Sequence, residues 1–274
     1  MSGRIVPTVD VVAAAGGLSG AGSGQQAPGT DFYQIKAKLE PFREIFHILL
    51  EDAQVARISL IEVDTQTRST GDGVTIYTLY EERSHHRRPR WAKGRAIFPP
   101  DTPTELQTAI MKQDTCDVSV LAFLPHITDA LQKIDARVDW LCGYIKPRIL
   151  IHYSDMDLEK VAMHSMFGIT CSSGEQYIAD FTIEQFGHDD DCWFTLKPDY
   201  LDRFVEDGDL RIATDDEIVV TEEDVAGDEF MSSLVVTVKT ICEEIDWKVY
   251  DGLPHQERRA WMESRAKLIM QRSL

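Results

Sequence analysis

Apolar residues recur along this chain with two different spacings, which together predict a mixture of helices and strands. Within residues 42–50 they fall at offsets 0, 3, 4, 7 and 8, the stripe of an amphipathic helix, and Pro41 suits the first turn of that helix. Residues 105–113 and 120–134 show helical spacing as well, although Pro125 implies that the second helix is kinked or divided into two pieces. A further helix is predicted near the C-terminus.

Runs rich in β-branched and aromatic residues predict strands in the remainder of the chain. The first three predicted strands are 56–65, 74–80 and 148–153. Two more apolar runs, 161–169 and 176–183, flank a Ser-Ser-Gly-Glu turn signal and therefore predict a β-hairpin. The expected fold class is α+β, with an antiparallel sheet packed by helices.

Composition divides the chain into a tail and one folded domain. Residues 1–30 are dominated by Gly, Ala and Ser and offer too little apolar surface to form a core, so they are predicted to be a disordered tail. Residues 31–274 are predicted to form a single α+β domain. Within it, segment 199–229 holds thirteen acidic residues and two arginines, and is expected to be an acidic surface lobe or a long loop with a little strand.

The charge balance restricts the classes of partner. The net charge is −18, from 46 acidic and 28 basic residues, which repels phosphate backbones and anionic lipid. General nucleic-acid binding and membrane association are therefore not expected. Segment 83–95 reverses the sign with six Lys or Arg and two His; it is either a solvated loop or a docking surface for an anionic partner. The N-terminus shows no secretory signal, so a cytoplasmic location with reduced thiols is expected.

The chain has five cysteines scattered along its sequence, which makes thiol chemistry a candidate function. None belongs to a CxxC pair, so neither a zinc ribbon nor a redox motif is indicated, and no cofactor is expected. Acyl transfer through a thiol needs an ionised cysteine, a histidine that moves its proton and an acceptor that orients the imidazole. Cys116 follows a capping signal at a predicted helix N-terminus, where negative charge is favoured. His164 and Asp180 lie on the two strands of the predicted hairpin and can face each other across it.

The order of these three residues resembles the transglutaminase-like branch of the papain-like cysteine enzymes. The resemblance covers about 70 residues and rests on segments 114–123, 164–169 and 177–182, the last matching the pattern of apolar residues that lead to a catalytic Asp followed by Thr. Asp114 stands where that family usually has a glycine. The resemblance implies a papain-like core in which Cys116 is the nucleophile, His164 the general base and acid, and Asp180 the orienting residue. The implied substrate is a small-molecule or peptide acyl compound.

Three alternatives stay open at this level. Cys142 is a reserve nucleophile. Segment 188–192, with the sequence His-Asp-Asp-Asp-Cys, is rich in metal-ligand types, but its spacing matches neither an EF-hand loop nor an HExxH helix, and an acidic solvated turn is the preferred interpretation. The chain as a whole could also be a non-catalytic binding or adaptor protein that keeps a transglutaminase-like scaffold.

Overall fold

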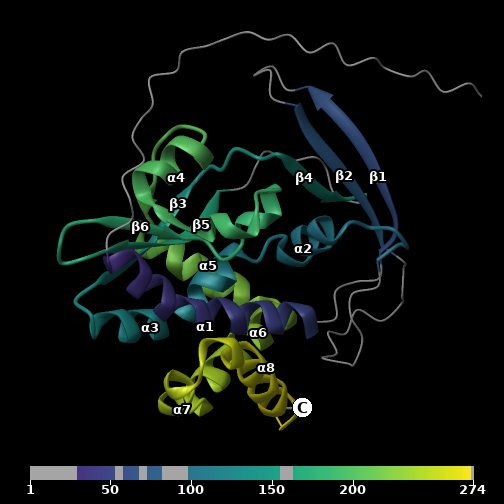
Figure 1. The fold of residues 1–274 in the computed structure, drawn as a ribbon. Coiled ribbons are helices and arrows are strands. Elements are labelled where there is room, and N and C mark those ends of the chain that lie inside the picture. Colours follow the sequence, from purple (N-terminus) through teal and green to yellow (C-terminus); the bar gives the residue numbers. More distant parts are fainter. Residues whose placement is uncertain (1–29, 53–57, 68–72, 82–97, 155–162, 273–274) are drawn as a thin grey trace, which may run out of the picture.

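A long apolar helix, α3 (Cys116–Gln132), lies across one face of a five-stranded sheet in the computed structural model of the chain (Figure 1). The structure describes residues 30–52, 58–67, 73–81, 98–154 and 163–272. The buried face of α3 carries Val120, Phe123 and Ile127, which contact the sheet and the neighbouring helix α1 (Thr30–Asp52). The sheet and these helices share the larger hydrophobic core.

The five-stranded sheet has the order β7-β6-β5-β3-β8, and every neighbouring pair is antiparallel. Its strands are β3 (Arg137–Gly143), β5 (His164–Thr170), β6 (Gln176–Ala179), β7 (Phe194–Leu196) and β8 (Arg211–Ile212). β5 and β6 form the predicted hairpin, with Gly174 at φ 85° in the turn, a conformation that favours glycine. The hairpin prediction is confirmed.

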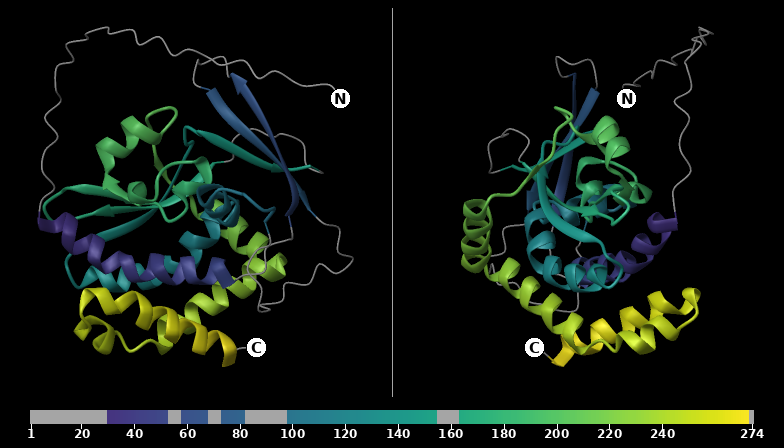
Figure 2. Two further views of the ribbon diagram at one scale, coloured as in Figure 1. Left: turned by 45° about the vertical axis from the view of Figure 1, so that its right-hand side comes forward. Right: turned by 90° about the vertical axis from the view of Figure 1, so that its left-hand side faces the viewer.

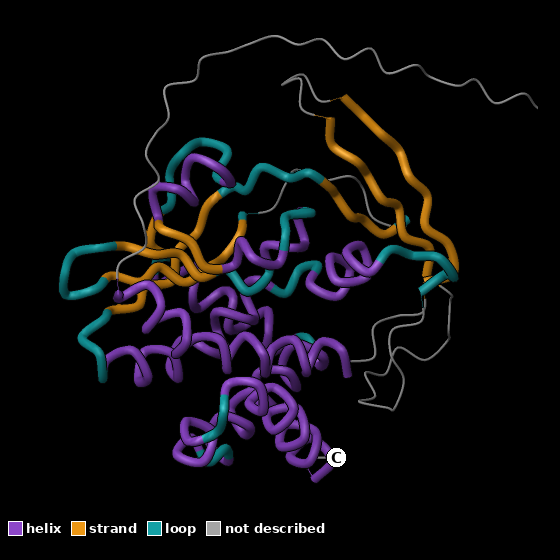
Figure 3. Tube along the Cα trace, in the orientation of Figure 1, coloured by secondary structure: helices purple, strands orange, loops and turns teal. Residues whose placement is uncertain are grey.

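A second group of strands stands apart from the first (Figure 3). It has the order β1-β2-β4 and consists of β1 (Ile58–Thr67), β2 (Gly73–Glu81) and β4 (Ile149–Tyr153). β1 pairs with β2 antiparallel, but β4 pairs with β2 in parallel. The expectation of a purely antiparallel sheet is therefore wrong here, because β4 reaches β2 by a long connection rather than by a tight turn. This sheet has its own small core against α2 (Thr104–Lys112).

The remaining helices cover both faces of the five-stranded sheet (Figure 2). α1, α3 and α6 lie on one side, with α7 and α8 forming an outer layer beyond them, and α4 packs near β6 and β7. The bounds are α4 (Lys197–Phe204), α5 (Asp215–Gly227), α6 (Glu229–Glu244), α7 (Trp247–Gly252) and α8 (His255–Arg272), with two short 3₁₀ helices, η1 (Ile183–Phe186) and η2 (Asp190–Trp193).

Two helices contain a proline in their interior. α1 begins at Thr30, so the prediction that Pro41 lies in the first turn is wrong. The apolar stripe extends upstream through Ile35 and Leu39, both buried, and this burial outweighs the local cost of the proline. α3 passes through Pro125 as one helix, which excludes the two-piece alternative.

The acidic segment 199–229 is largely helical, which corrects the expectation of a long loop, while strand β8 within it is the short strand that was expected. Its last part forms α5, whose N-terminus carries a capping box between Thr214 and Glu217. Acidic residues in the first helical turn complement the helix dipole, so a run of acids there favours helix formation. No residue of α5 is buried, so the exposed character expected for the segment holds there, whereas Tyr200, Phe204 and Val205 earlier in the segment are buried.

Two sequence expectations fall outside the described residues: the tail predicted for residues 1–30, of which only Thr30 is described, and the basic segment 83–95. Across the described ranges, no helix is long and apolar enough to cross a membrane.

Candidate active site

Cys116 is the first residue of α3. The turn between α2 and α3 passes through Asp114, whose φ of 57° lies in the left-handed region that Asp tolerates better than most residues. Thr115 follows as the N-cap residue, and its hydroxyl donates to the carbonyl of Lys112 at 2.8 Å. The thiol thus sits where the unpaired N–H groups of the first helical turn favour a negative charge. Cys116 is 9% exposed.

His164 and Asp180 form a buried hydrogen-bonded pair. The distance from Nε2 of His164 to Oδ2 of Asp180 is 2.8 Å, and the two residues are 1% and 0% exposed. β5 pairs with β6 so that Phe167 lies opposite Ala179. Continuing this register by one residue places Asp180 opposite the residue two positions after His164. Side chains two positions apart on a strand point to the same face, so His164 and Asp180 share a face. The predicted juxtaposition of the two side chains is confirmed.

Hydrogen bonds satisfy both oxygens of the Asp180 carboxylate. Oδ2 accepts from the hydroxyl of Tyr200 at 2.6 Å as well as facing His164. Oδ1 accepts from the backbone N–H of Thr182 at 3.0 Å and from its hydroxyl at 3.3 Å. Such a set stabilises the charged form of a buried carboxylate.

The electrostatics of the pair favour opposite charges. Burial by itself disfavours the imidazolium, but the Asp180 carboxylate and, to a smaller extent, Cys116 raise the pKa of His164 above its usual value. Burial likewise opposes ionisation of Asp180, yet His164, Tyr200 and Thr182 lower the pKa of that carboxyl below its usual value. An ionised Asp180 accepts a proton-bearing Nε2, so the other ring nitrogen, Nδ1, is the one available for proton transfer. Cys116 acts on this ring electrostatically, which places its thiol in the neighbourhood of the His164–Asp180 pair.

Two residues of η1 hold the other side of the imidazole. Nε2 of Gln185 lies 3.2 Å from Nδ1 of His164, and Oε1 of Gln185 accepts from the backbone N–H of Asp114 at 3.3 Å. Phe186 meets the His164 ring edge-on, with a centroid distance of 4.9 Å and an interplanar angle of 89°. Gln185 therefore joins the segment that leads to Cys116 to the histidine.

The reserve nucleophile Cys142 is not part of this group. It lies opposite Ser165 on the neighbouring strand β3, and Ser165 points to the sheet face away from His164. Burial raises the pKa of the Cys142 thiol. Burial also raises the pKa of Cys171 to about 11 and that of Cys242 to about 12. Cys116 is the cysteine that the fold brings to the His–Asp pair.

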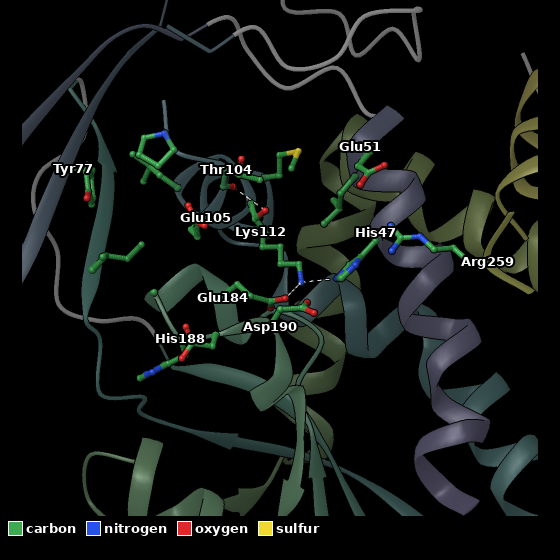
Figure 4. A pocket seen from close by; sticks show the side chains of 18 residues that line it. His47, Glu51, Tyr77, Thr104, Glu105, Lys112, Glu184, His188, Asp190 and Arg259 are labelled. Atoms are coloured by element: carbon green, nitrogen blue, oxygen red, sulfur yellow. Dashed lines mark hydrogen bonds and ion pairs between the residues drawn. The ribbon is translucent and has the colours of Figure 1, made fainter. Parts of the chain in front are cut away.

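A second polar cluster lies on the far side of the Glu184–Gln185 segment, at one end of a cavity of about 530 Å³ between α1, α2 and η1 (Figure 4). Lys112, 2% exposed, donates to Oε1 of Glu184 at 2.6 Å and contacts Nε2 of His47 at 2.6 Å. Arg43 pairs with the same Glu184 oxygen at 2.7 Å and with Asp190. Burial lowers the pKa of Lys112 to about 8 and raises that of Glu184.

Two groups of described residues have ligand atoms close enough to share a metal ion. The first is His47, Glu184 and Asp190, but the Lys112 ammonium and the Arg43 guanidinium already occupy the space between these ligands. Two fixed cations oppose a divalent ion there. The ion pairs alone account for this cluster.

The second group is Asp189, Asp191 and Cys192, in the segment that the sequence marked as ligand-rich. Its aspartates are exposed, as expected for a solvated acidic turn. His188 and Cys192 are instead buried, and Nε2 of His188 bonds the carbonyl of Lys146 at 2.8 Å, which turns this ring away from the acids. The prediction of a solvated turn therefore holds for the aspartates alone.

Fold and site together define a mixed helix and sheet protein that holds a buried cysteine, histidine and aspartate in one constellation. No known protein family, no curated protein and no solved structure matches this chain. The chemistry of these side chains is therefore the basis for any functional assignment.

Sequence reasoning missed the supporting residues Gln185 and Tyr200. It included Thr182 in the family pattern without assigning its bonds to Asp180, although an Asp side chain commonly accepts from the backbone N–H two residues further on. Gln185 and Tyr200 had no such signal: they follow Asp180 by 5 and 20 positions, and only the η1 turn and helix α4 bring them back to the pair.

Proposed function

We propose that this protein carries out cysteine-dependent acyl transfer or amide hydrolysis, with Cys116 as nucleophile, His164 as general base and acid, and Asp180 as the orienting carboxylate. One observation carries the proposal: Nε2 of His164 bonds a buried carboxylate at 2.8 Å, and Cys116, the first residue of α3, acts electrostatically on the same imidazole. A thiol, a base within reach and a third group that orients the base are the parts that nucleophilic catalysis needs.

The geometry implies a definite proton path. Nδ1 of His164 takes the thiol proton, and the Cys116 sulfur then adds to the acyl carbonyl carbon of the substrate. Collapse of the tetrahedral adduct breaks the bond to the leaving amine, which receives the proton from Nδ1, and leaves a thioester on Cys116. Water or a second amine attacks the thioester, again losing a proton to Nδ1, which restores the thiol. Asp180 keeps the proton on Nε2 throughout.

The resemblance to the transglutaminase-like branch of papain-like enzymes adds support. That branch usually has a glycine two residues before the nucleophile, and Asp114 stands there in this chain. Its φ of 57° is a value that glycine adopts freely, so glycine would fit this position of the backbone as well. A papain-like core, with a small-molecule or peptide acyl compound as substrate, belongs to the same proposal.

Thiol labelling tests the proposal without requiring the substrate. Each cysteine is followed by mass spectrometry during reaction with iodoacetamide at pH 6 and pH 7, in the wild type and in His164→Ala. A thiolate paired with an imidazolium is expected to make Cys116 react at least about tenfold faster than the four other cysteines, and His164→Ala is expected to remove that advantage.

The matched control is His255→Ala, because the side chain of His255 is 86% exposed and lies away from the site. This variant should label as the wild type does. Equal labelling of Cys116 in wild type and His164→Ala would instead exclude an activated thiol, and the interpretation as a non-catalytic binding or adaptor protein would replace the enzyme.

A further inference from the structure

Nδ1 of His164 is the ring nitrogen that Asp180 leaves free, and Gln185 already faces it. Asp180 occupies Nε2 and Nε2 of Gln185 lies 3.2 Å from Nδ1, so a proton from Cys116, which acts on the ring electrostatically, must go to Nδ1. A neutral imidazole offers one in-plane lone pair there, which accepts one well-directed hydrogen bond. The proton that Cys116 must transfer therefore has to go to a position that Gln185 already contacts.

The orientation of the Gln185 amide follows from its other contact. Its Oε1 accepts the backbone N–H of Asp114 at 3.3 Å, and a backbone N–H can donate only to the oxygen end of an amide. The NH₂ end is thereby directed at His164. Gln185 is 6% exposed and held between two segments, so rotation of the amide would break the bond to Asp114.

The consequence for His164 is a conflict between its two nitrogens. At Nε2, the ionised Asp180 favours the imidazolium. At Nδ1, the N–H of Gln185 favours the neutral ring, because the hydrogen on a protonated Nδ1 would lie against the hydrogen of the Gln185 amide. Among the described residues, Cys116 of α3 and Tyr200 of α4 also act on the pair, the latter facing Asp180. His188 also interacts with Asp180.

We propose that Gln185 restrains the Cys116–His164 pair by donating to Nδ1, the nitrogen that must take the thiol proton, which lowers the share of the imidazolium at rest. This inference rests on the proposed function and adds regulation to the same site. A bound acyl compound, whose carbonyl oxygen is an acceptor, offers the Gln185 N–H an alternative partner and so frees Nδ1. Gln185 is in this sense a positioning residue that acts through His164.

The test compares the rate of Cys116 alkylation by iodoacetamide at pH 6 and at pH 9, in the wild type and in Gln185→Met. Methionine keeps the length of the side chain and removes the donor. At pH 9 an ordinary thiol is largely ionised, so the ratio of the pH 6 rate to the pH 9 rate reports the paired thiolate rather than exposure. We expect this ratio to rise roughly two- to tenfold in Gln185→Met, the effect of one neutral hydrogen bond.

Gln176→Met is the matched control, because Gln176 is an exposed glutamine at the start of β6 and should leave the ratio unchanged. Gln185→Leu is a second donor-free variant should Gln185→Met fail to fold. An unchanged or lower ratio would overturn the restraint, as would an equal increase at both pH values, which reports only a loosened site. The proposed function is tested separately: it fails if iodoacetamide labels Cys116 at the same rate in His164→Ala and in the wild type.

Discussion

Tyr200 donates a 2.6 Å hydrogen bond to Oδ2 of Asp180, the same oxygen that faces His164. Tyr200 lies on α4, 20 residues beyond Asp180, and its side chain is fully buried. Helix α4 is thereby tied to the centre of the site. Burial and the Asp180 charge raise the pKa of the Tyr200 hydroxyl well above its usual value, so this group remains a donor at any ordinary pH.

Removal of that hydroxyl should weaken the fold measurably. Tyr200→Phe deletes a hydrogen bond to a buried charge, for which a loss of about 1.5–3 kcal/mol in the free energy of unfolding is expected. Urea denaturation at pH 7 measures it. Tyr33→Phe is the control, because Tyr33 is 63% exposed, and its effect should fall within about 0.5 kcal/mol. A neutral Tyr200→Phe would show that the carboxylate finds another donor.

The His164–Asp180 pair should make stability depend on pH in a window set by both residues. The lowered pKa of Asp180 means that its contribution is present above its unfolded value of about 3.9 and is lost as the pH falls through the lower folded value. The raised pKa of His164 means that its contribution is full below about 6.5 and is lost as the pH rises through the higher folded value.

Asp180→Asn tests this window. The variant keeps the shape of the side chain but removes the charge, so its loss of stability relative to wild type should be largest between about pH 4 and 6.5 and smaller at pH 9. Urea denaturation at pH 5, 7 and 9 provides the comparison. Asp207→Asn, at an exposed position, should show no such trend. A constant difference across the three pH values would mean that His164 is not charged beside Asp180.

The buried cluster around Lys112 should respond unequally to the loss of its members. Glu184→Gln leaves the cations of Lys112 and Arg43 buried without their shared carboxylate, which is expected to cost about 3–5 kcal/mol. Lys112→Met should cost less, because Arg43 still pairs with Glu184. The double variant Lys112→Met/Glu184→Gln is therefore expected to be more stable than Glu184→Gln alone.

A double-mutant cycle from urea denaturation measures that coupling. The exposed pair Glu263–Lys267 on α8, at 2.5 Å, serves as the comparison and should show only about 0.3–0.5 kcal/mol. A coupling of the same small size at Lys112–Glu184 would contradict the buried ion pair.

The capping box of α5 should decide whether that helix persists. Thr214→Ala removes the acceptor for the N–H of Glu217, so the amides of α5 should exchange with deuterium several-fold faster, consistent with a cap effect of about 0.5–2 kcal/mol. Global stability should change little because α5 buries no residue. Thr221→Ala, inside the same helix, is the control. An unchanged exchange rate in Thr214→Ala would mean that packing on α6, and not the cap, stabilises the helix.

Local sequence patterns determined much of the fold. The apolar stripe of α3 follows from periodicity, because burying one face imposes a repeat of about 3.6 on a helix. The hairpin of β5 and β6 and the strands β1, β2 and β4 follow from runs rich in apolar, β-branched and aromatic residues and from turn signals. The same patterns anticipated that His164 and Asp180 would meet, since a hairpin brings its own strands together by short-range contacts. Cys116 at a helix N-terminus also followed from local capping signals.

Tertiary structure decided what local patterns leave open. Nothing in the pattern around β4 specifies a parallel partner, because pairing across a long connection depends on which surfaces are left to bury. The helix α1 runs through Pro41 because contacts of its buried stripe with the core outweigh one lost backbone bond. The acidic helix α5 depends on a capping box, which is not evident from composition alone.

The site divides in the same way. The sequence by itself identified the three proposed catalytic residues, because each belongs to a local element that a helix cap or a strand pattern predicts. The partners that set their charge, Gln185 at Nδ1 and Tyr200 at Asp180, come from η1 and α4. A hydrogen bond of about 3 Å forms only where the packed core fixes the distance between two elements. A local sequence pattern does not specify that distance.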